Sequence, residues 1–280
     1  MKKIFILVAV LLSFKAFLFA SEHKLRVISL APSITEILFA LGLDEEIVGV
    51  SSFCNYPPQA NNKPRIGSFS QPDIEKIISL RPDIVFCTGL QQERVVNQLK
   101  QLNLKLYISD PKNIEELMVS IKEIGQITNR VKEADELVNN MRRNINLVIN
   151  KTKDIPLNKR PKVFFLFWDE PLMTVGYGCF IDELIYLAGG RNITHHIKRP
   201  YTYFSFEQLI KEDPECIIAT YMGKDKYSFR KNFIWNFLKA TKSNRIYTDI
   251  EPDILLRPGP RLIEGLLKIY QRLYFEDEKF

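Results

Sequence analysis

The amino-acid sequence predicts an α/β protein in which two Rossmann-like α/β lobes are joined by one long α-helix, with a ligand cleft between the lobes. The first observation is an internal repeat: ITEILFALG at 34–42 returns as IDELIYLAG at 181–189. In each half a glutamate follows, Glu75 or Glu207, seven residues before a proline that opens a short apolar strand. Any α/β chain repeats helix-then-strand phrases, but two ordered matches with identical spacing favour a true repeat. Clefts between two lobes are common places for small molecules to bind.

The second observation is a helical pattern of 23 residues at 131–153, between the two repeats. Its apolar residues recur every three or four positions in one narrow stripe, and no glycine or proline interrupts it. Such a helix would run ~34 Å and could join the lobes; the alternative is an ordinary surface helix of the first lobe. We expect a signal peptide at 1–20, a first lobe at 24–129, a connecting helix at 130–154 and a second lobe at 160–280.

Within the first lobe, β-rich runs alternate with helical patterns; the runs lie at 26–30, 47–50, from 84 and at 106–108. The motif Ser33-x-x-Glu36 predicts a capping box, in which each side chain bonds the other residue's backbone amide. Gly42 predicts the end of that helix, and Asn113-x-x-Glu116 predicts the start of another. Strands that alternate with helices are typical of a parallel sheet covered on both faces.

The second lobe begins again with a strand at 162–166 and a loop at 168–176. The repeated helix then runs to Ala188, and an aromatic and basic loop follows at 193–204. The segment RPGPR at 257–261 predicts a rigid turn before a last amphipathic helix.

The first twenty residues are typical of a secretory signal peptide. They have a basic start at Lys2 and Lys3, an apolar run at 4–12 and a small residue, Ala20, at the expected cut. Lys15 interrupts the apolar stretch, so an uncleaved membrane anchor is the alternative. No other stretch approaches the ~20 apolar residues of a membrane span. Removing three lysines and no acid lowers the net charge from +6 to +3, and without a basic cluster interleaved with aromatics we expect no nucleic-acid binding.

The cysteines and histidines do not form a known reactive motif. Export implies an oxidising compartment, and Cys54 and Cys87, both near strand ends, are the candidate pair for a disulfide. None of the four cysteines has CxxC spacing. His195 and His196 are adjacent, which disfavours chelation of one metal by both, and a solvated loop pair is the expected arrangement.

Catalytic motifs are missing from the sequence. It contains no GxGxxG, P-loop or GxSxG segment, and nothing assembles a nucleophile, a base and an orienting group. We therefore expect no catalytic residues and no resident metal. An exported hydrolase is the alternative from a different class, and this absence disfavours it.

Aromatic side chains follow several of the predicted strands. Ligands of open α/β sheets bind at the carboxyl ends of the strands, and large rings with polar tips suit a bulky, flat, partly polar ligand. The residues are Phe53, Tyr56, Phe69, Trp168, Tyr201, Tyr203 and Phe204.

Four segments carry a family resemblance: RVISLAPSITE at 26–36, VSSFCNYPP at 50–58, LRPDIV at 80–85 and PLMTVG at 171–176. They resemble the periplasmic cobalamin-binding proteins of ABC importers, within a larger group that also carries iron-siderophores and haem. The resemblance implies a periplasmic, monomeric binding protein that captures a corrinoid and delivers it to a permease dimer, with cobalamin as cargo and no resident cofactor. An iron-siderophore or haem is the alternative cargo; for haem, Tyr201 or Tyr203 would supply an axial oxygen, with His195 or His196 opposite.

By the same resemblance, seven residues map onto the ligand pocket of the family: Phe53, Pro57, Phe69, Cys87, Met173, Tyr201 and Arg257. The family often has tryptophan where this chain has Phe69, Cys87 and Tyr201, which leaves a smaller ring area. A second-lobe disulfide of the family is absent, since its positions fall near Ala188 and Leu267. Docking to the permease is implied for Glu93 and Glu207, although the internal repeat would have paired Glu75 with Glu207.

Overall fold

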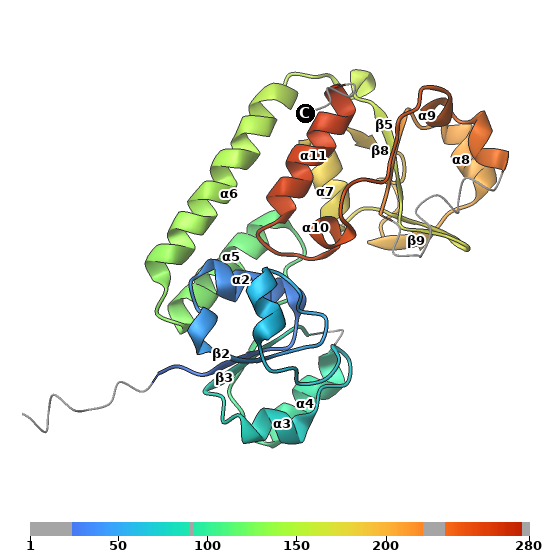
Figure 1. The fold of residues 1–280 in the computed structure, drawn as a ribbon. Coiled ribbons are helices and arrows are strands. Elements are labelled where there is room, and N and C mark those ends of the chain that lie inside the picture. Colours follow the sequence, from blue (N-terminus) through green and yellow to red (C-terminus); the bar gives the residue numbers. More distant parts are fainter. Residues whose placement is uncertain (1–23, 90–91, 221–232, 276–280) are drawn as a thin grey trace, which may run out of the picture.

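The computed structural model describes residues 24–275, apart from 90–91 and 221–232, and consists of two α/β lobes set along one long helix (Figure 1). The strands of the main sheets are β1 (Val27–Ser29), β2 (Ile47–Val50), β3 (Ile84–Cys87), β4 (Leu106–Ile108), β5 (Lys162–Leu166), β8 (Arg191–Asn192), β10 (Cys216–Ala219) and β11 (Ile246–Tyr247). Both sheets are parallel, with the orders β2-β1-β3-β4 and β8-β5-β10-β11. The two orders correspond strand by strand, which confirms the internal repeat.

The helices pack around these two sheets. They are α2 (Pro32–Ala40), α3 (Ile74–Ser79), α4 (Glu93–Gln101), α5 (Ile114–Ile127), α6 (Val131–Thr152), α7 (Phe180–Leu187), α8 (Phe206–Glu212), α9 (Lys239–Lys242), α10 (Pro252–Leu256) and α11 (Leu262–Tyr274), with short 3₁₀ helices at Asp44–Glu46, Pro58–Asn62, Leu157–Lys159 and Phe233–Phe237. The repeat pairs α2 with α7 and α3 with α8, because each pair joins corresponding strands.

The second lobe carries an insertion that the first lobe lacks in its described residues. Strands β6 (Trp168–Asp169), β7 (Leu172–Val175) and β9 (Tyr201–Tyr203) form a small antiparallel sheet in the order β6-β7-β9. In Figure 1, β9 lies on the side of the second lobe that is nearer the first lobe.

The long helix α6 is the predicted connection between the lobes. Its buried residues are Ala134, Val138, Met141, Ile145, Val148 and Thr152, while Val131, at the start of the predicted stripe, is 49% exposed. It packs on α5 of the first lobe and on α7 and α11 of the second, so it is not a surface helix of one lobe. Among the described residues, no helix has the length and apolar character needed to cross a membrane.

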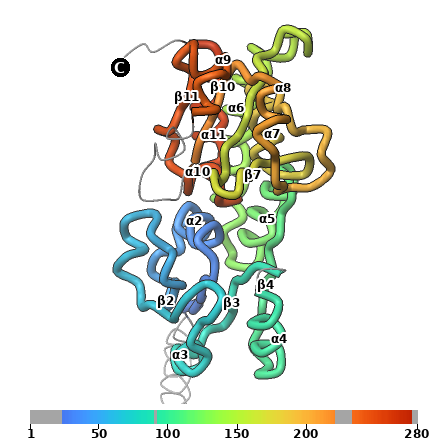
Figure 2. Tube along the Cα trace, turned by 90° about the vertical axis from the view of Figure 1, so that its right-hand side faces the viewer, coloured from blue at the N-terminus to red at the C-terminus, as the bar shows by residue number. Residues whose placement is uncertain are grey.

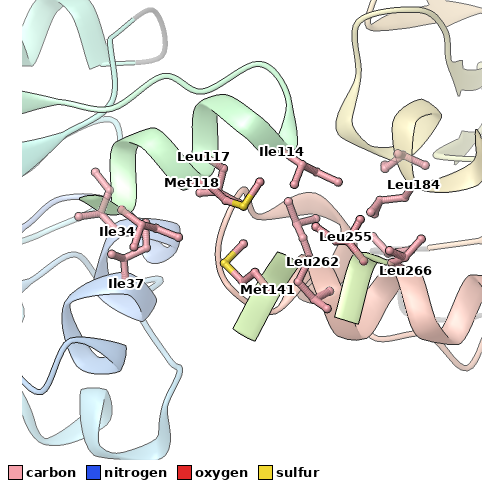
Figure 3. Packing of buried hydrophobic residues seen from close by; sticks show 14 of the residues in the cluster. Ile34, Ile37, Ile114, Leu117, Met118, Met141, Leu184, Leu255, Leu262 and Leu266 are labelled. Carbon is pink, nitrogen blue, oxygen red and sulfur yellow. The ribbon is translucent and has the colours of Figure 1, made fainter. Parts of the chain in front are cut away.

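One apolar core runs through the junction of the lobes. Figure 3 shows Ile34 and Leu117 of the first lobe, Met141 of α6 and Leu266 of the second lobe in the same cluster. Figure 2, turned by 90°, shows α2, α5 and α10 at the level where the lobes meet. A continuous close-packed core resists relative motion of the lobes, because each displaced side chain would leave unfilled space.

The cap of α2 differs from the prediction. The helix begins at Pro32 with Ala31 at the N-cap and no side-chain cap bond, so the capping box of Ser33 and Glu36 is wrong. The reason is that Pro32 has the backbone angle of a first helical position and needs no amide partner, which places Glu36 one turn inside the helix. Gly42 (φ 74°) and the Asn113 cap, which accepts from the Glu116 amide at 2.8 Å, are as predicted.

The candidate pair Cys54 and Cys87 does not form a disulfide in this structure. All four cysteines are free and buried. The Cys54 sulfur is hydrogen-bonded to Thr35 Oγ1 at 3.0 Å and to Ser51 Oγ at 3.1 Å, so it is held at a separate place in the core. Phe204, expected among the ligand-facing aromatics, is 8% exposed and packs on Phe164 in the second-lobe core.

Candidate ligand site between the lobes

Glu36 of α2 is the centre of a polar contact between the lobes. Its carboxylate accepts from Arg261 Nε at 2.9 Å and from an Arg261 terminal nitrogen at 2.7 Å, with Arg257 at 3.4 Å. The side chains of Glu36 and Arg261 are 2% and 7% exposed, and the Tyr56 ring covers the Arg261 guanidinium at 3.8 Å. Burial acts to lower the pKa of Arg261, but the hydrogen bonds and charge of Glu36 raise it above its ordinary value. We call Glu36, Arg257 and Arg261 the interlobe clamp.

Arg257 ties the first loop to this clamp. One terminal nitrogen donates to Asn55 Oδ1 at 2.7 Å, and the other contacts Asp253 at 2.6 Å and the Phe53 carbonyl at 3.4 Å. The Arg257 guanidinium, predicted to bind ligand, is thus engaged by protein groups and fixes the loop that carries Phe53. The Phe53 ring itself is 59% exposed.

The antiparallel sheet of the second lobe presents a row of large side chains. Met173 pairs directly with Trp168 on one neighbouring strand and with Tyr203 on the other. Side chains directly opposite one another lie on the same face of a sheet, and Tyr201 shares that face two residues along β9. Residues of the opposite face, such as Leu172, are buried in the core, so the row Trp168, Met173, Tyr203 and Tyr201 is the open face.

Tyr201 is anchored within this row. Its ring lies 5.2 Å from that of Phe167, and its hydroxyl is hydrogen-bonded to Cys179. Burial, followed by the proximity of Cys179, raises the pKa of Tyr201 above its ordinary value. A phenolate at this position is therefore disfavoured.

The remaining first-lobe residues lie at or behind the strand ends. Cys87 is fully buried and its sulfur contacts the Tyr107 carbonyl at 3.6 Å; burial raises the pKa of the Cys87 thiol to about 12. Phe69 is half-buried and packs on the core. Gln92, itself buried, donates to the carbonyls of Phe69 at 2.7 Å and Leu30 at 3.2 Å and accepts from the Thr88 amide at 2.9 Å. This amide fixes three strand-end loops relative to one another.

A cavity of about 620 Å³ opens beside α6, where the lobes meet. Its walls include Phe39 of α2, Met141 of α6 and Leu267 of α11, and of the seven predicted ligand residues it contains Pro57 alone. The structure thus brings Phe53 and Arg257 together, and Met173 and Tyr201 together, but Pro57 faces the α6 side.

The predicted docking residues lie at exposed helix starts. Glu93 is the first residue of α4 and Glu207 the second residue of α8, and both are exposed. Acids are favoured in a first helical turn by the helix dipole, and Glu75 in the first turn of α3 is exposed as well. Exposure alone does not assign docking to any of the three.

The two loop histidines are both exposed, as predicted, but they differ in their contacts. His195 Nδ1 lies 2.9 Å from Oδ2 of Asp182, a buried residue in the first turn of α7. Within the described part of the chain, no group of three or more His, Cys, Asp or Glu could hold a metal ion.

Two α/β lobes of matching topology, a rigid connecting helix and exposed aromatic side chains from both lobes define a two-lobed binding protein for a small molecule. The chain belongs to the periplasmic binding protein family, whose pattern matches residues 27–251. Membership of this family places the protein outside the cytoplasm as a substrate-binding component of transport.

Two relatives of known sequence match nearly the whole chain. An uncharacterized ABC transporter substrate-binding lipoprotein, YvrC of Bacillus subtilis, is 30% identical over 254 residues, which are 89% of this chain and 80% of that protein. The vitamin B12-binding protein of Vibrio parahaemolyticus is 25% identical over 96% of this chain and 95% of its own.

Solved structures show the same fold. The periplasmic vitamin B12-binding protein BtuF of Vibrio cholerae has a TM-score of 0.76 and 26% identity over 89% of this chain and 96% of that one. The periplasmic heme-binding protein HutB of Vibrio cholerae has a TM-score of 0.79 at 22% identity over 90% and 99% of the two chains, a likeness of fold alone.

Sequence reasoning missed the interlobe clamp, Gln92 and the pairing of Asp182 with His195. The one available signal was the repeat itself: Glu36 and Glu183 occupy the same place in its two copies. Each bonds to the opposite lobe, Glu36 to Arg261 and Glu183 to the Ile114 amide at 3.0 Å.

Proposed function

We propose that this protein captures a corrinoid, cobalamin or a close relative of it, between its lobes and delivers it to an ABC importer. The observation that carries the proposal is the open aromatic row of the second lobe together with the exposed Phe53 of the first. Vitamin B12-binding relatives that match over almost the full chain support the choice of ligand. Large apolar side chains on both sides suit a flat, bulky ring system with polar edges.

In this proposal the seven residues have different parts. Phe53, Met173 and Tyr201 contact the corrin ring, and Phe69 shapes the first-lobe side, while Pro57, which faces the α6 side, supports the first loop from behind. Cys87 acts from behind this surface, since its side chain is buried. Arg257 acts by holding the Phe53 loop in place.

Delivery is proposed to use one exposed glutamate on each lobe, Glu93 and Glu207, paired with cations of a permease dimer. The binding protein acts as a monomer after loss of its signal peptide, which lies outside the described residues. It performs no chemistry on its cargo.

Equilibrium binding of cyanocobalamin to the purified mature protein tests the ligand. Phe53→Ala should weaken binding about tenfold or more, because burying an aromatic side chain contributes ~1.5–3 kcal/mol. Tyr186→Ala is the control. Tyr186 is an aromatic residue of similar exposure (56%) at the C-terminal end of α7, and its removal should leave cobalamin affinity unchanged. Absence of binding at tens of micromolar would remove the corrinoid and leave an iron-siderophore or haem.

Haem is the second candidate, since Tyr203 is 69% exposed on the open row. The raised pKa of Tyr201 makes Tyr203 the better axial oxygen of the two. A Soret band on haem titration that is lost in Tyr203→Phe and kept in Tyr201→Phe would favour this cargo.

A further inference from the structure

The cavity beside α6 is built by both lobes and is separate from the proposed cargo surface. Its walls come from α2 and the first loop of the first lobe, from α6, and from the first turns of α11 in the second lobe. Its volume of about 620 Å³ falls in the usual range of small-molecule sites, ~300–1,000 Å³. No residue of the open row lines it, and in Figure 1 α6 and β9 lie on opposite sides of α7 and α11.

The inner wall of this cavity is apolar. Met141 of α6 is 3% exposed and belongs to the continuous core, while Phe39 of α2 and Leu137 of α6 are half-buried and pack against that core. An apolar body placed on these side chains leaves water, which is favourable in proportion to the area buried. The Phe39 ring and the Met141 thioether also suit contact with another ring.

The charges around the cavity favour a cation over an anion. Among the described residues that line it, Arg261 is the cation, and Glu36, Asp44 and Glu264 are the acids. The Arg261 guanidinium is 7% exposed and bonded to Glu36, so an anionic ligand could reach it only by breaking the interlobe clamp. Asp44 pairs with Lys63, which does not line the cavity.

Glu264 is the acid that a ligand could reach. It lies in the first turn of α11, is exposed, and forms no ion pair with another described residue. On α6, Asn144 Nδ2 donates to the Asn140 carbonyl at 2.9 Å and to Asn140 Oδ1 at 3.2 Å, so Asn144 offers its amide oxygen to a ligand. The polar part of the lining thus consists mainly of hydrogen-bond acceptors, which an ammonium group with its three N–H donors would satisfy.

We propose that this cavity is a second ligand site, for a small organic amine. The ammonium group pairs with Glu264, and the apolar body of the amine lies against Phe39, Leu137 and Met141. A bound amine contacts both lobes and therefore stabilises their junction. This site is independent of the nature of the cargo.

Isothermal titration of the purified mature protein with three ligands of one skeleton tests the site. The ligands are phenethylamine, 2-phenylethanol and 3-phenylpropanoate, which end in an ammonium, a hydroxyl and a carboxylate. The amine should bind about fivefold more tightly than the alcohol, which is the upper end for a partly exposed ion pair, and the carboxylate more weakly than the alcohol. Added salt should narrow the difference between amine and alcohol.

Two variants assign the charge and the cavity. Glu264→Gln keeps the shape of the side chain, so it should lower the amine affinity to that of the alcohol and leave the alcohol affinity unchanged. Glu136→Gln is the matched control: it removes an exposed acid of α6 that does not line the cavity, and it should keep the fivefold difference. Ala40→Phe, at the exposed last residue of α2, places a ring in the cavity and should weaken amine and alcohol alike by tenfold or more. Melting temperatures check that each variant is folded, and if Ala40→Phe is not, Glu264→Gln decides.

The opposite results are equally defined. No amine binding at millimolar concentration, equal affinities for amine and alcohol, or a difference that survives Glu264→Gln would overturn the proposal. So would an equal loss in Glu136→Gln, since it would show attraction to the overall charge of the protein. Phe53 does not line the cavity, so Phe53→Ala should bind the amine as wild type does; a loss there would place the amine in the cargo cleft and overturn the second site.

Discussion

Removal of the charge at Glu36 is the sharpest test of how the two lobes are held. In Glu36→Gln the side chain keeps its size, but the buried guanidinium of Arg261 loses its buried carboxylate partner and faces an amide that also donates, leaving only the exposed Glu251 at 3.6 Å. Breaking one partner of a buried pair costs about 3–5 kcal/mol, since the other charge stays buried and uncompensated. With about 2–4 °C per kcal/mol for a protein of this size, the melting temperature should fall by roughly 6–20 °C.

Thermal unfolding followed by circular dichroism measures this loss. Glu136→Gln is the matched control, because Glu136 makes an exposed pair with Lys132 on α6, with side chains 69% and 86% exposed. Such surface pairs contribute about 0–1 kcal/mol. A melting temperature of Glu36→Gln as close to wild type as that of the control would refute the reasoning.

A second variant separates the loss of charge from the loss of shape. In Glu36→Gln combined with Arg261→Met, the uncompensated cation is removed and the Tyr56 ring can pack on an apolar side chain instead. Apolar replacement of a buried pair is often neutral, so the double variant should be more stable than Glu36→Gln alone. A double variant that loses further stability would show that the effect of Glu36 does not arise from Arg261.

Three further predictions concern docking, the cargo-side loop and pH. Glu93→Lys with Glu207→Lys should abolish uptake in cells while ligand affinity in solution stays within about threefold, because exposed substitutions perturb folding little; loss of ligand binding would make the docking assignment wrong. In Gly176→Ala the new methyl would lie 2.5–2.6 Å from the carbonyl oxygens of residues 197 and 199, so both the melting temperature and the ligand affinity should fall. Gly42→Ala is the control: its methyl enters open space at φ 74°, so it should lower the melting temperature by a few degrees and leave ligand affinity unchanged. Burial raises the pKa of the Glu183 carboxyl above 4.5, so the folded state binds this proton more tightly than the unfolded state does. The contribution of Glu183 to the free energy of unfolding should therefore rise as the pH falls from neutral towards 4.5. Glu183→Gln keeps an acceptor for the Ile114 amide and should remove this rise, measured as the difference in the free energy of unfolding between pH 7 and pH 5.

Local periodicity was enough to predict most strands of the two parallel sheets and the long helices. It did not predict the antiparallel sheet β6-β7-β9, since 168–176 and 193–204 were expected to be loops. The stripe of α6 is visible because its apolar positions recur at helical spacing over 22 residues, and the repeat identified the second lobe. The cap of α2 was mispredicted, since Pro32 offers an earlier helix start than Ser33 and both signals lie within two residues.

The site was less predictable, because its contacts join residues far apart in the chain. Glu36 and Arg261 are 225 positions apart, and no local pattern shows that two separate charges will meet. Arg257 was identified as a cargo residue by resemblance, yet its partners in the fold are protein groups. Asp182 and His195 are 13 positions apart and are brought together by the return of the chain from α7 to β8.

The motion of the lobes follows from the same contacts. A single helix without glycine or proline has no short loop positions that absorb backbone rotation, which is where hinges usually lie. The apolar core continues from α2 through Met141 to Leu266, and the repeat-related glutamates bond across the junction on α2 and α7.

We therefore predict that the lobes turn by several degrees rather than tens when ligand binds. Small-angle scattering of the protein with and without cyanocobalamin measures this, and a large compaction would show that α6 is not a rigid strut. Glu36→Gln should widen the range of lobe orientations in the free protein, because it weakens the buried polar contact of Glu36 with Arg261 across the junction while α6 stays intact. A permease that reads the spacing of Glu93 and Glu207 would then distinguish loaded from empty protein by small displacements, so uptake should suffer in Glu36→Gln even at ligand concentrations that saturate it.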